Sequence, residues 1–419
     1  MAIPHVDVCL IGAGPQALAV AITLRSVAPE LQVRAFDPSG TWMQAWDHAF
    51  AAFDISHLRS PGVHHPHPDA SAWSRFREAR RLAPVGQYDF PSTSAFAAFC
   101  AECVRDAQLA DAVEAGTVCR IRRAGSRFTL ECEGGRSLTA EHVVVATNPR
   151  RRRIPAVLAG GGETSDTIRH SSAVDLRTSE PAGRTIGVIG GGLTAYNLAA
   201  GAVARGARVL LITRRALRGR QFDVDPGWLG PKYLAGFSHI ADPRRRRTTA
   251  LAARDGGSMT PAAIGHLRSL AQQGLISVFE GHALIGVDDR GRRHVLRLER
   301  AGTPCSVVVD EVWFATGSDP TVHAEPFLRR LARDADAPVV EGLPVLDHAL
   351  RWPGAGVHVA GALAMLELGP AAGNLWGGRR AGARIAHAIV GNTRRAVEDP
   401  AFGPSISMVP PPGCGVRDG

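Results

Sequence analysis

Two glycine-rich loops, each between an apolar strand-like run and a helix-like run, constrain the fold of this chain more than any other feature. The first is GAGPQA at residues 12–17, after VDVCLI and before PQALAVAITLRSVA. The second is GGGLTA at residues 190–195, after TIGVI and before LTAYNLAAGAVARG. This order is typical of a dinucleotide-binding βαβ unit, although a glycine turn in an ordinary βα unit is the alternative for each loop. Two such loops predict two bound dinucleotides, and therefore electron transfer between them.

The residue types in both loops suit a pyrophosphate. Gly12 and Gly190 allow a tight turn, while Gly14 and Gly192 let the backbone approach the phosphates. The N-terminus of the following helix then faces the negative charge. The residues that begin these helices complete the expected contacts: Pro15 and Gln16 in the first, Leu193 and Thr194 in the second.

The end of the second strand in each unit distinguishes the two nucleotides. Asp37 ends LQVRAFD in the first unit, where a carboxylate accepts hydrogen bonds from ribose hydroxyls, as in an FAD site. Arg214 and Arg215 follow RVLLIT in the second unit, where a guanidinium suits the 2′-phosphate of NADPH. The alternative for the two arginines is a solvated strand end. We therefore expect FAD in the first site and NADPH in the second.

A repeated order of elements follows each loop. In the first half the strands TVCRIRR, RFTLECE and the closing HVVVATN alternate with glycine-rich turns. In the second half ISVFEG, HVLRLER and the closing VVVDEVWFATG take the same places. Period-2 patterns with such turns indicate hairpins, so we expect a β-meander in each half. The fold class is thus α/β, with two Rossmann-like domains.

The chain is expected to return to its first domain near the end. GVHVAGA (356–362) reads as a strand, and PAAGNLWGGRRAGARIAHAIV as a helix whose N-terminus points at the flavin. The predicted division is an FAD domain at 1–175 and 321–395, with an inserted NADPH domain at 176–320. Residues 216–270 form a helical segment within the insert, and 396–419 form a disordered tail.

Composition excludes several function classes. The formal charge of +9 comes from arginine, Lys232 being the only lysine, and the arginine runs lack interleaved aromatic residues, so we expect no nucleic-acid partner. Seven scattered cysteines, an odd number, suit a reducing compartment. No run of 18 apolar residues and no leader-like segment occurs, which predicts a soluble, cytoplasmic protein without a membrane partner. Homo-oligomerisation is left open.

Two clusters have alternative interpretations. His64, His65 and His67 have a metal-like spacing, but no carboxylate or cysteine cluster supports a metal site, and we expect none. Cys100 and Cys103 form CAEC within the helix-like SAFAAFCAECVRDA, where their spacing places both on one helix face. A redox-active pair is the less favoured interpretation.

Several segments resemble the class B flavin-dependent monooxygenases, nearest the branch that N-hydroxylates lysine and ornithine. GAGPQALA is similar to the first loop of that branch, and DEVWFATGSDPTVH (310–323) to its ATG signature. HLRSPGVHHPHPD, FPSTSAFAAF and IRHSS also resemble family segments. Ser318 stands where the signature carries tyrosine, and Asn148 replaces the glycine of the first ATG motif.

The resemblance implies an FAD- and NADPH-dependent monooxygenase. Such an enzyme transfers one oxygen atom of dioxygen from a flavin hydroperoxide to a small nucleophilic metabolite. Amine N-hydroxylation, a reaction of secondary metabolism, is the favoured reaction, and oxygenation of sulfur or carbon is the alternative. The alternatives are an NADPH-linked flavin oxidase or reductase without substrate oxygenation, and a non-catalytic flavin-binding regulatory protein. Fold alone does not choose among them.

The resemblance also implies a set of site residues. Arg59, Ser318 and His323 are the catalytic candidates, although Arg59 also suits a structural ion pair, and the other two a turn that ends a strand. The segment that covers the flavin contributes Trp46, His57 and Leu58. The remaining cofactor contacts are expected from Thr316 and Gly317 after the second strand set, and from Gly361, Asn374 and Leu375 at the C-terminal helix.

Overall fold

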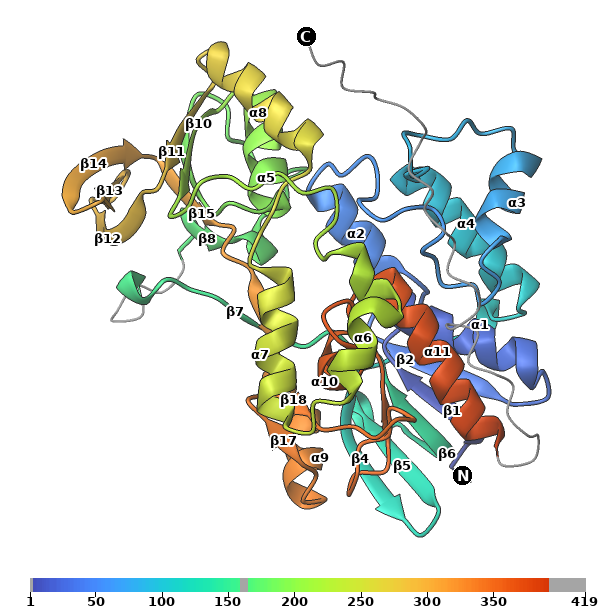
Figure 1. Cartoon of the computed structure of the whole chain (residues 1–419). Coiled ribbons are helices and arrows are strands. Elements are labelled where there is room, and N and C mark those ends of the chain that lie inside the picture. Colours follow the sequence, from blue (N-terminus) through green and yellow to red (C-terminus); the bar gives the residue numbers. More distant parts are fainter. Residues whose placement is uncertain (1–2, 159–164, 392–419) are drawn as a thin grey trace.

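The computed structural model describes residues 3–158 and 165–391, and the predicted tail lies outside this range. The chain forms one mixed and one parallel sheet, each with its own glycine loop, and the helices α6 and α7 run between them (Figure 1). This arrangement confirms the predicted α/β class with two Rossmann-like units. Below, the first unit is the part built on the first sheet and the second unit the part built on the second.

The first sheet begins the chain and receives its last strand. In spatial order it contains β3 (Val113–Ala115), β2 (Val33–Asp37), β1 (His5–Ile11), β6 (Ser137–Val145), β5 (Arg127–Cys132) and β4 (Val118–Ala124), with β19 (His358–Val359) beside β6. The strands β3, β2, β1, β6 and β19 are parallel, while β5 and β4 continue antiparallel as the predicted meander. The predicted strand 356–362 is shorter than expected, because Gly361 turns the chain at a φ of +81°.

Six helices surround this sheet. They are α1 (Pro15–Val27), α2 (Gln44–Ala52), α3 (Ala72–Ala79), α4 (Thr93–Asp106), α9 (Pro326–Asp334) and α11 (Leu375–Val390), with the short α10 (Met365–Leu368) before the last. The chain adds 3-10 turns at Ala110–Ala112, Glu133–Gly135, Ala156–Leu158, Ser171–Ala173, Pro226–Leu229, Val322–Ala324 and Gly361–Ala364. A two-stranded hairpin joins β17 (Val339–Val340) to β18 (Leu343–Pro344).

The second sheet is entirely parallel. Its order is β11 (Ile276–Glu280), β10 (Arg208–Thr213), β9 (Thr185–Ile189), β15 (Glu311–Phe314) and β8 (Ile168–His170). The prediction that residues 276–281 start the second meander is wrong, because β11 pairs in parallel with β10, Ile276 opposite Val209. A crossover through the helices after β10 makes this direction available, whereas period-2 alternation alone does not tell a parallel edge strand from a hairpin strand.

The second meander consists of β12 (Ala283–Asp289), β13 (His294–Arg300) and β14 (Thr303–Val309). The predicted closing strand 307–317 is therefore divided between two sheets. Asp310 makes the break: its backbone N–H donates to Thr185 O at 2.8 Å, and its carboxylate accepts from Thr185 N at 2.7 Å. These two bonds fix the chain as it passes from β14 to β15.

The two faces of the second sheet are covered differently. One face, with Val188, Leu211 and Trp313, packs against α5 (Leu193–Ala204) and α8 (Pro261–Gln272). The other face, with Ile212 and Phe314, packs against the meander. The helices α6 (Pro231–Ser238) and α7 (Pro243–Arg254) lie within the segment predicted to be helical, and their buried residues Phe237 and Ala250 pack into the core of the first unit.

The chain passes between the units along two adjacent connections. β7 (Arg150–Arg152) leads out and β16 (Ser318–Pro320) leads back, and they pair antiparallel with Ser318 opposite Arg152. β8 lies between residues 168 and 170 and already belongs to the second sheet. The predicted boundary at residue 175 lies a few residues beyond this strand and stays a prediction.

Helices α1 and α11 are in close contact. Gly382 of α11 lies against the first helix, where an added Cβ would be 2.8 Å from Ala19 O and 2.9 Å from Thr23 Oγ1. Gly378, one turn earlier, lies against Gln16 in the same way. Small residues at this spacing let the two helix backbones approach, so the N-terminus of α11 is held beside the first glycine loop.

Replacing Gly382 by alanine is expected to force the two helices apart and to lower the free energy of unfolding by about 1–3 kcal/mol. Gly265→Ala on α8 is the matched control, because its Cβ position has no atom within 4 Å. There the substitution should stabilise the helix by up to ~1 kcal/mol. Urea unfolding of both variants measures the difference, and equal stabilities would contradict the close contact.

Candidate functional site

The first glycine loop has an open face. Gly12 follows β1 with a φ of +99°. An added Cβ at Gly14 would meet nothing within 4 Å, which leaves space for a phosphate at the N-terminus of α1. Asp37, half-buried at the end of β2, accepts hydrogen bonds from Ala13 N at 3.0 Å and from Ser39 N at 2.9 Å. Its carboxylate is thereby fixed beside the loop.

The N-terminus of α11 meets this loop through a side chain. Gln16 Nε2 donates to the carbonyl oxygen of Asn374, the residue before α11, at 3.0 Å. Gln16 Oε1 is buried without a hydrogen-bond partner in the described part of the chain, and so is Oγ1 of Thr147, which follows β6. A buried polar atom without a partner is costly. These two atoms therefore fit a bound polar group.

The second glycine loop differs because another segment covers it. Gly190 has a φ of +152°, and an added Cβ would lie only 2.4 Å from Ala315 O, so glycine is required there. An added Cβ at Gly192 would lie 3.3 Å from Cα of Gly257. Gly257 belongs to the turn between α7 and α8. The backbone of this turn therefore lies where the first loop has open space.

Arg215 lies at the edge of the same turn, and Arg214 beside it is exposed. Arg215 Nη1 is 3.7 Å from Oδ1 of Asp255, and Arg218 pairs with Oδ2 of the same carboxylate. All three charged side chains are about two-fifths exposed. The predicted 2′-phosphate position is thus next to a carboxylate in this structure.

Arg59 joins the first unit to the second. Its guanidinium donates to Gln221 O at 2.9 Å, Arg220 O at 2.8 Å and Ser258 Oγ at 2.8 Å. Burial lowers the pKa of Arg59, the positive charges of Arg254 and Arg220 lower it further, and the charge of Asp223 opposes the change. These contacts are to carbonyl and hydroxyl oxygens and not to a carboxylate, so the ion pair and the catalytic role of Arg59 both stay predictions.

Asp223 is a residue that the sequence motifs did not indicate. Its Oδ2 accepts from Arg254 Nη2 at 2.8 Å, and its Oδ1 accepts from Asn374 Nδ2 at 3.2 Å. Arg254 also donates to Pro370 O at 2.8 Å. A continuous polar chain therefore runs from Gln16 through Asn374, Asp223 and Arg254 to the turn that covers the second loop. No local pattern marks these residues, because their contacts join distant parts of the sequence.

The residues after β15 lie at the crossing between the units. Gly317 O accepts hydrogen bonds from Arg153 N and from His170 Nε2, both at 3.0 Å, and Thr316 Oγ1 donates to Arg153 O. Ser318 is half-buried in β16, whereas His323 is exposed and lies near Gly342 of the β17–β18 hairpin. The predicted catalytic roles of Ser318 and His323 stay predictions.

The predicted flavin-covering segment is fixed to α4. Trp46 stacks on Phe50 at 4.5 Å between ring centroids and contacts Phe96 of α4 at 6.0 Å. Leu58 is buried and its N–H donates to Pro91 O, while the neighbouring His57 is exposed and bridges Ser92. On the other side, Leu375 is buried at the start of α11. Their cofactor contacts stay predictions.

The side chains of the histidine cluster pack against neighbouring residues and do not point at a common centre. His65 is fully buried, contacts the ring of Phe99 and hydrogen-bonds Ala70 O at 3.2 Å. Burial lowers the pKa of both His64 and His65 to about 4, so both rings are neutral. Over residues 3–158 and 165–391, no group of three His, Cys, Asp or Glu side chains is placed to hold a metal ion.

The cysteine pair lies on the buried face of α4. Cys100 and Cys103 are both free thiols and are almost fully buried. Burial raises the pKa of Cys100 well above its ordinary value, and burial with nearby carboxylates raises that of Cys103 to about 12. A thiol held protonated is a poor nucleophile, which favours the structural interpretation of the CAEC pair.

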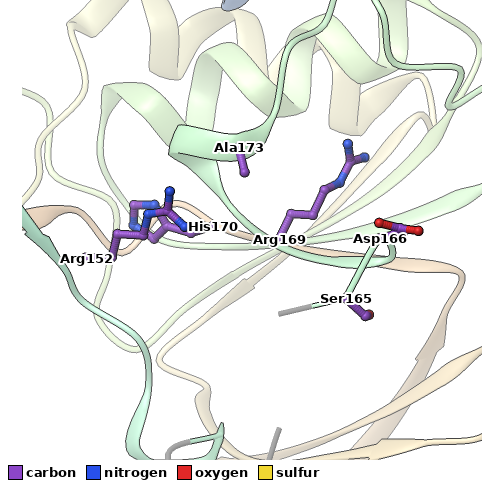
Figure 2. Close-up of a pocket in the computed structure, with 6 residues that line it drawn as sticks. All are labelled: Arg152, Ser165, Asp166, Arg169, His170 and Ala173. Carbon is purple, nitrogen blue, oxygen red and sulfur yellow. The ribbon is translucent and has the colours of Figure 1, made fainter. Parts of the chain in front are cut away.

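A cavity of about 510 Å³ lies beside β8. Arg152 and His170 lie together at one end of it, while Arg169 and Asp166 lie at the other (Figure 2). Arg169 is already paired with the buried Glu311 at 2.6 Å. None of its lining residues is among the predicted site residues, so the cavity lies outside the predicted site.

A family model described as pyridine nucleotide-disulphide oxidoreductase matches residues 6–225, more than half of the chain. The chain belongs to this family. The match spans both glycine loops, and no curated protein matches the chain. Within the described residues, no helix of this family member is long and apolar enough to cross a membrane.

Solved structures show the fold. An ornithine N-hydroxylase from Kutzneria sp. 744, with reduced FAD, NADP+ and L-ornithine, has a TM-score of 0.75 at 18% identity over 92% of this chain and 99% of its own. A cadaverine monooxygenase from Erwinia amylovora, bound to FAD, has a TM-score of 0.74 at 16% identity, over 99% of this chain and 100% of its own. A bacillithiol disulfide reductase from Bacillus cereus has a TM-score of 0.58 at 20% identity, over 92% of this chain and 98% of its own. The fold therefore resembles that of the N-hydroxylating monooxygenases, as the sequence predicted.

Arg59→Lys tests the joint between the units. Lysine cannot reproduce the planar fork that reaches acceptors on three residues, so the free energy of unfolding should fall by about 1–3 kcal/mol. The segment 216–258 should also be cleaved faster in limited proteolysis. Arg75→Lys, at an exposed ion pair with Asp69, is the control and should change neither. An unchanged stability and cleavage pattern would contradict the structural role.

Proposed function

We propose that this chain is an FAD- and NADPH-dependent monooxygenase that N-hydroxylates a small amine. In the balanced reaction, the amine, dioxygen, NADPH and a proton give the hydroxylamine, NADP+ and water. The observation that carries the proposal is the polar chain from Gln16 to Arg254, which joins the first glycine loop to the turn that covers the second. The similarity to amine-hydroxylating enzymes supports the choice of substrate class.

The first loop fits FAD on observations of this structure. The open space at Gly14, the fixed carboxylate of Asp37 and the unpartnered Gln16 Oε1 and Thr147 Oγ1 all suit a bound dinucleotide. The N-terminus of α11 lies beside the same loop, so its partial positive charge would act on the flavin. Bound flavin supplies electron transfer and activation of dioxygen.

The chain's own residues would position the reactants. Asn374 and Asp223 hold the start of α11 against the second unit, and Arg59 holds the covering turn against the first. Trp46 and Leu58 would exclude water from the flavin side. Ser318 and His323, near the crossing between the units, remain the candidates for contact with substrate. The free cysteines and the use of NADPH suit the cytoplasm, which we also propose.

A flavin oxidase or reductase without substrate oxygenation is the second candidate. The similarity to a bacillithiol disulfide reductase favours it, although at a lower TM-score than the two amine hydroxylases. A non-catalytic flavin-binding protein is the third, because Asn148 and Ser318 depart from the motifs of the monooxygenases that the chain resembles.

Stoichiometry separates the three. The FAD-loaded protein is mixed with NADPH, air and one amine at a time: lysine, ornithine or cadaverine. NADPH oxidation, hydroxylamine formation and hydrogen peroxide release are measured together. A monooxygenase should form hydroxylamine nearly equal to the NADPH oxidised, while an oxidase should release peroxide in that amount whichever amine is present. A non-catalytic protein should oxidise no NADPH.

Replacing both Arg214 and Arg215 by alanine is expected to weaken NADP+ binding at least about tenfold and NAD+ binding much less. The reason is the loss of charge-assisted hydrogen bonds to the 2′-phosphate. Arg292→Ala, exposed in the turn between β12 and β13, is the control and should leave both affinities unchanged. Titration calorimetry measures the two dissociation constants. An equal loss for both nucleotides would contradict the assignment of the second site.

A further inference from the structure

The two glycine loops have the same backbone plan but different surroundings. At Gly14 the position of an added Cβ is open, whereas at the equivalent Gly192 it is 3.3 Å from Gly257 Cα. The contact is close in the reverse direction too, since an added Cβ at Gly257 would be 2.8 Å from Gly192 Cα. In this type of loop, the second glycine is the place where a pyrophosphate approaches the backbone. Gly257 therefore lies in the path of the nucleotide.

The same turn also places a negative charge where the 2′-phosphate of the nucleotide is predicted to bind. Asp255, just before Gly256 and Gly257, has a left-handed backbone with a φ of +47°. Its carboxylate is shared by Arg215 and Arg218. A carboxylate is the side-chain group closest in charge and geometry to a phosphate, and arginine binds both through the same fork. The turn therefore places an anion beside the predicted 2′-phosphate site and backbone beside the pyrophosphate site.

The turn is also attached to the first unit at both ends. Arg254, before Asp255, donates to Pro370 O of the first unit and to Asp223, which in turn accepts from Asn374 of the first unit. Ser258, after Gly257, accepts from Arg59 at Oγ. Movement of the turn off the second loop therefore acts directly on residues that hold the start of α11.

We propose that the turn Asp255–Ser258 mimics the nucleotide, with Asp255 competing with the 2′-phosphate for Arg215 and Gly257 occupying the place of the pyrophosphate. The inference rests on the proposed NADPH site and adds a specificity-determining residue to it. A nucleotide with a 2′-phosphate displaces both parts of the turn, because it supplies a stronger anion to the arginines. A nucleotide without one must displace Gly257 while Asp255 keeps its partners. Asp255 thus sets the selectivity between the two.

The test measures binding to the FAD-loaded protein with two probes, 2′,5′-ADP and 5′-AMP, by titration calorimetry. Asp255→Asn keeps the left-handed backbone, which asparagine tolerates, and removes the competing charge. It should increase the affinity for 2′,5′-ADP roughly two- to fivefold, the range expected of an exposed ion pair, and leave the affinity for 5′-AMP unchanged. Gly257→Ala should increase the affinity for both probes, because the added Cβ pushes the turn away from Gly192.

Two matched variants control the experiment. Asp54→Asn removes an exposed carboxylate at a φ of +51° that is paired with Arg205, away from the second loop. Gly265→Ala adds a methyl group on α8 with no atom within 4 Å. Both should bind the probes like the wild type.

Hydrogen exchange at residues 254–260 should increase when 2′,5′-ADP binds.

The outcomes separate this inference from the proposed function. Binding of 2′,5′-ADP to the wild type that Asp255→Asn leaves unchanged or weakens overturns the inference alone, since Asp255 would then be no competitor. Protection of residues 254–260 by the probe also overturns it. Failure of the wild type and all variants to bind either probe overturns the second nucleotide site, and this inference with it.

Discussion

The pairing of β7 with β16 is the constraint on which the rest of the structure depends. The chain leaves the first unit along Arg150–Arg152 and returns along Ser318–Pro320, and the two connections hydrogen-bond to each other. Two paired connections resist twisting more than one linker does, so the two sheets hold a limited range of orientations. Each glycine loop lies at the carboxyl end of the strand before it, β1 in the first sheet and β9 in the second, where parallel sheets bind ligands. The crossing therefore sets how the two loops face each other.

Polar contacts between the units then refine this arrangement. The contacts of Arg59, Asp223 and Arg254 all join segments more than 30 residues apart in sequence. Hydrogen bonds to charged groups are stronger than neutral ones, but a polar interface holds two units together less rigidly than a packed apolar core does. An interface of this kind can hold one arrangement and still release it. That property suits a protein in which one nucleotide must enter, transfer electrons and leave while the other stays bound.

Much of the fold was accessible from the sequence because its signals are local. The loops at Gly12 and Gly190, the strands before them and the helix after Asn374 are encoded by short patterns with direct physical causes. The errors occurred where pairing is decided by tertiary structure. Residues 276–281 alternate like a hairpin strand but pair in parallel, and Asp310 divides a continuous apolar run between two sheets. The polar chain through Asp223 could not be predicted, since its partners are brought together only by the fold.

The family name raises the question of where the electrons go. In a disulphide oxidoreductase the acceptor is a sulphur pair, but the closest cysteines of the CAEC motif are buried on α4 and their raised pKa values keep them as thiols. The six cysteines of the described chain are all free, and the two exposed ones lie on β4 and β14, in different sheets. A disulfide between those strands would need a different fold. The described residues therefore favour an acceptor that diffuses in, and dioxygen with a small amine meets that requirement.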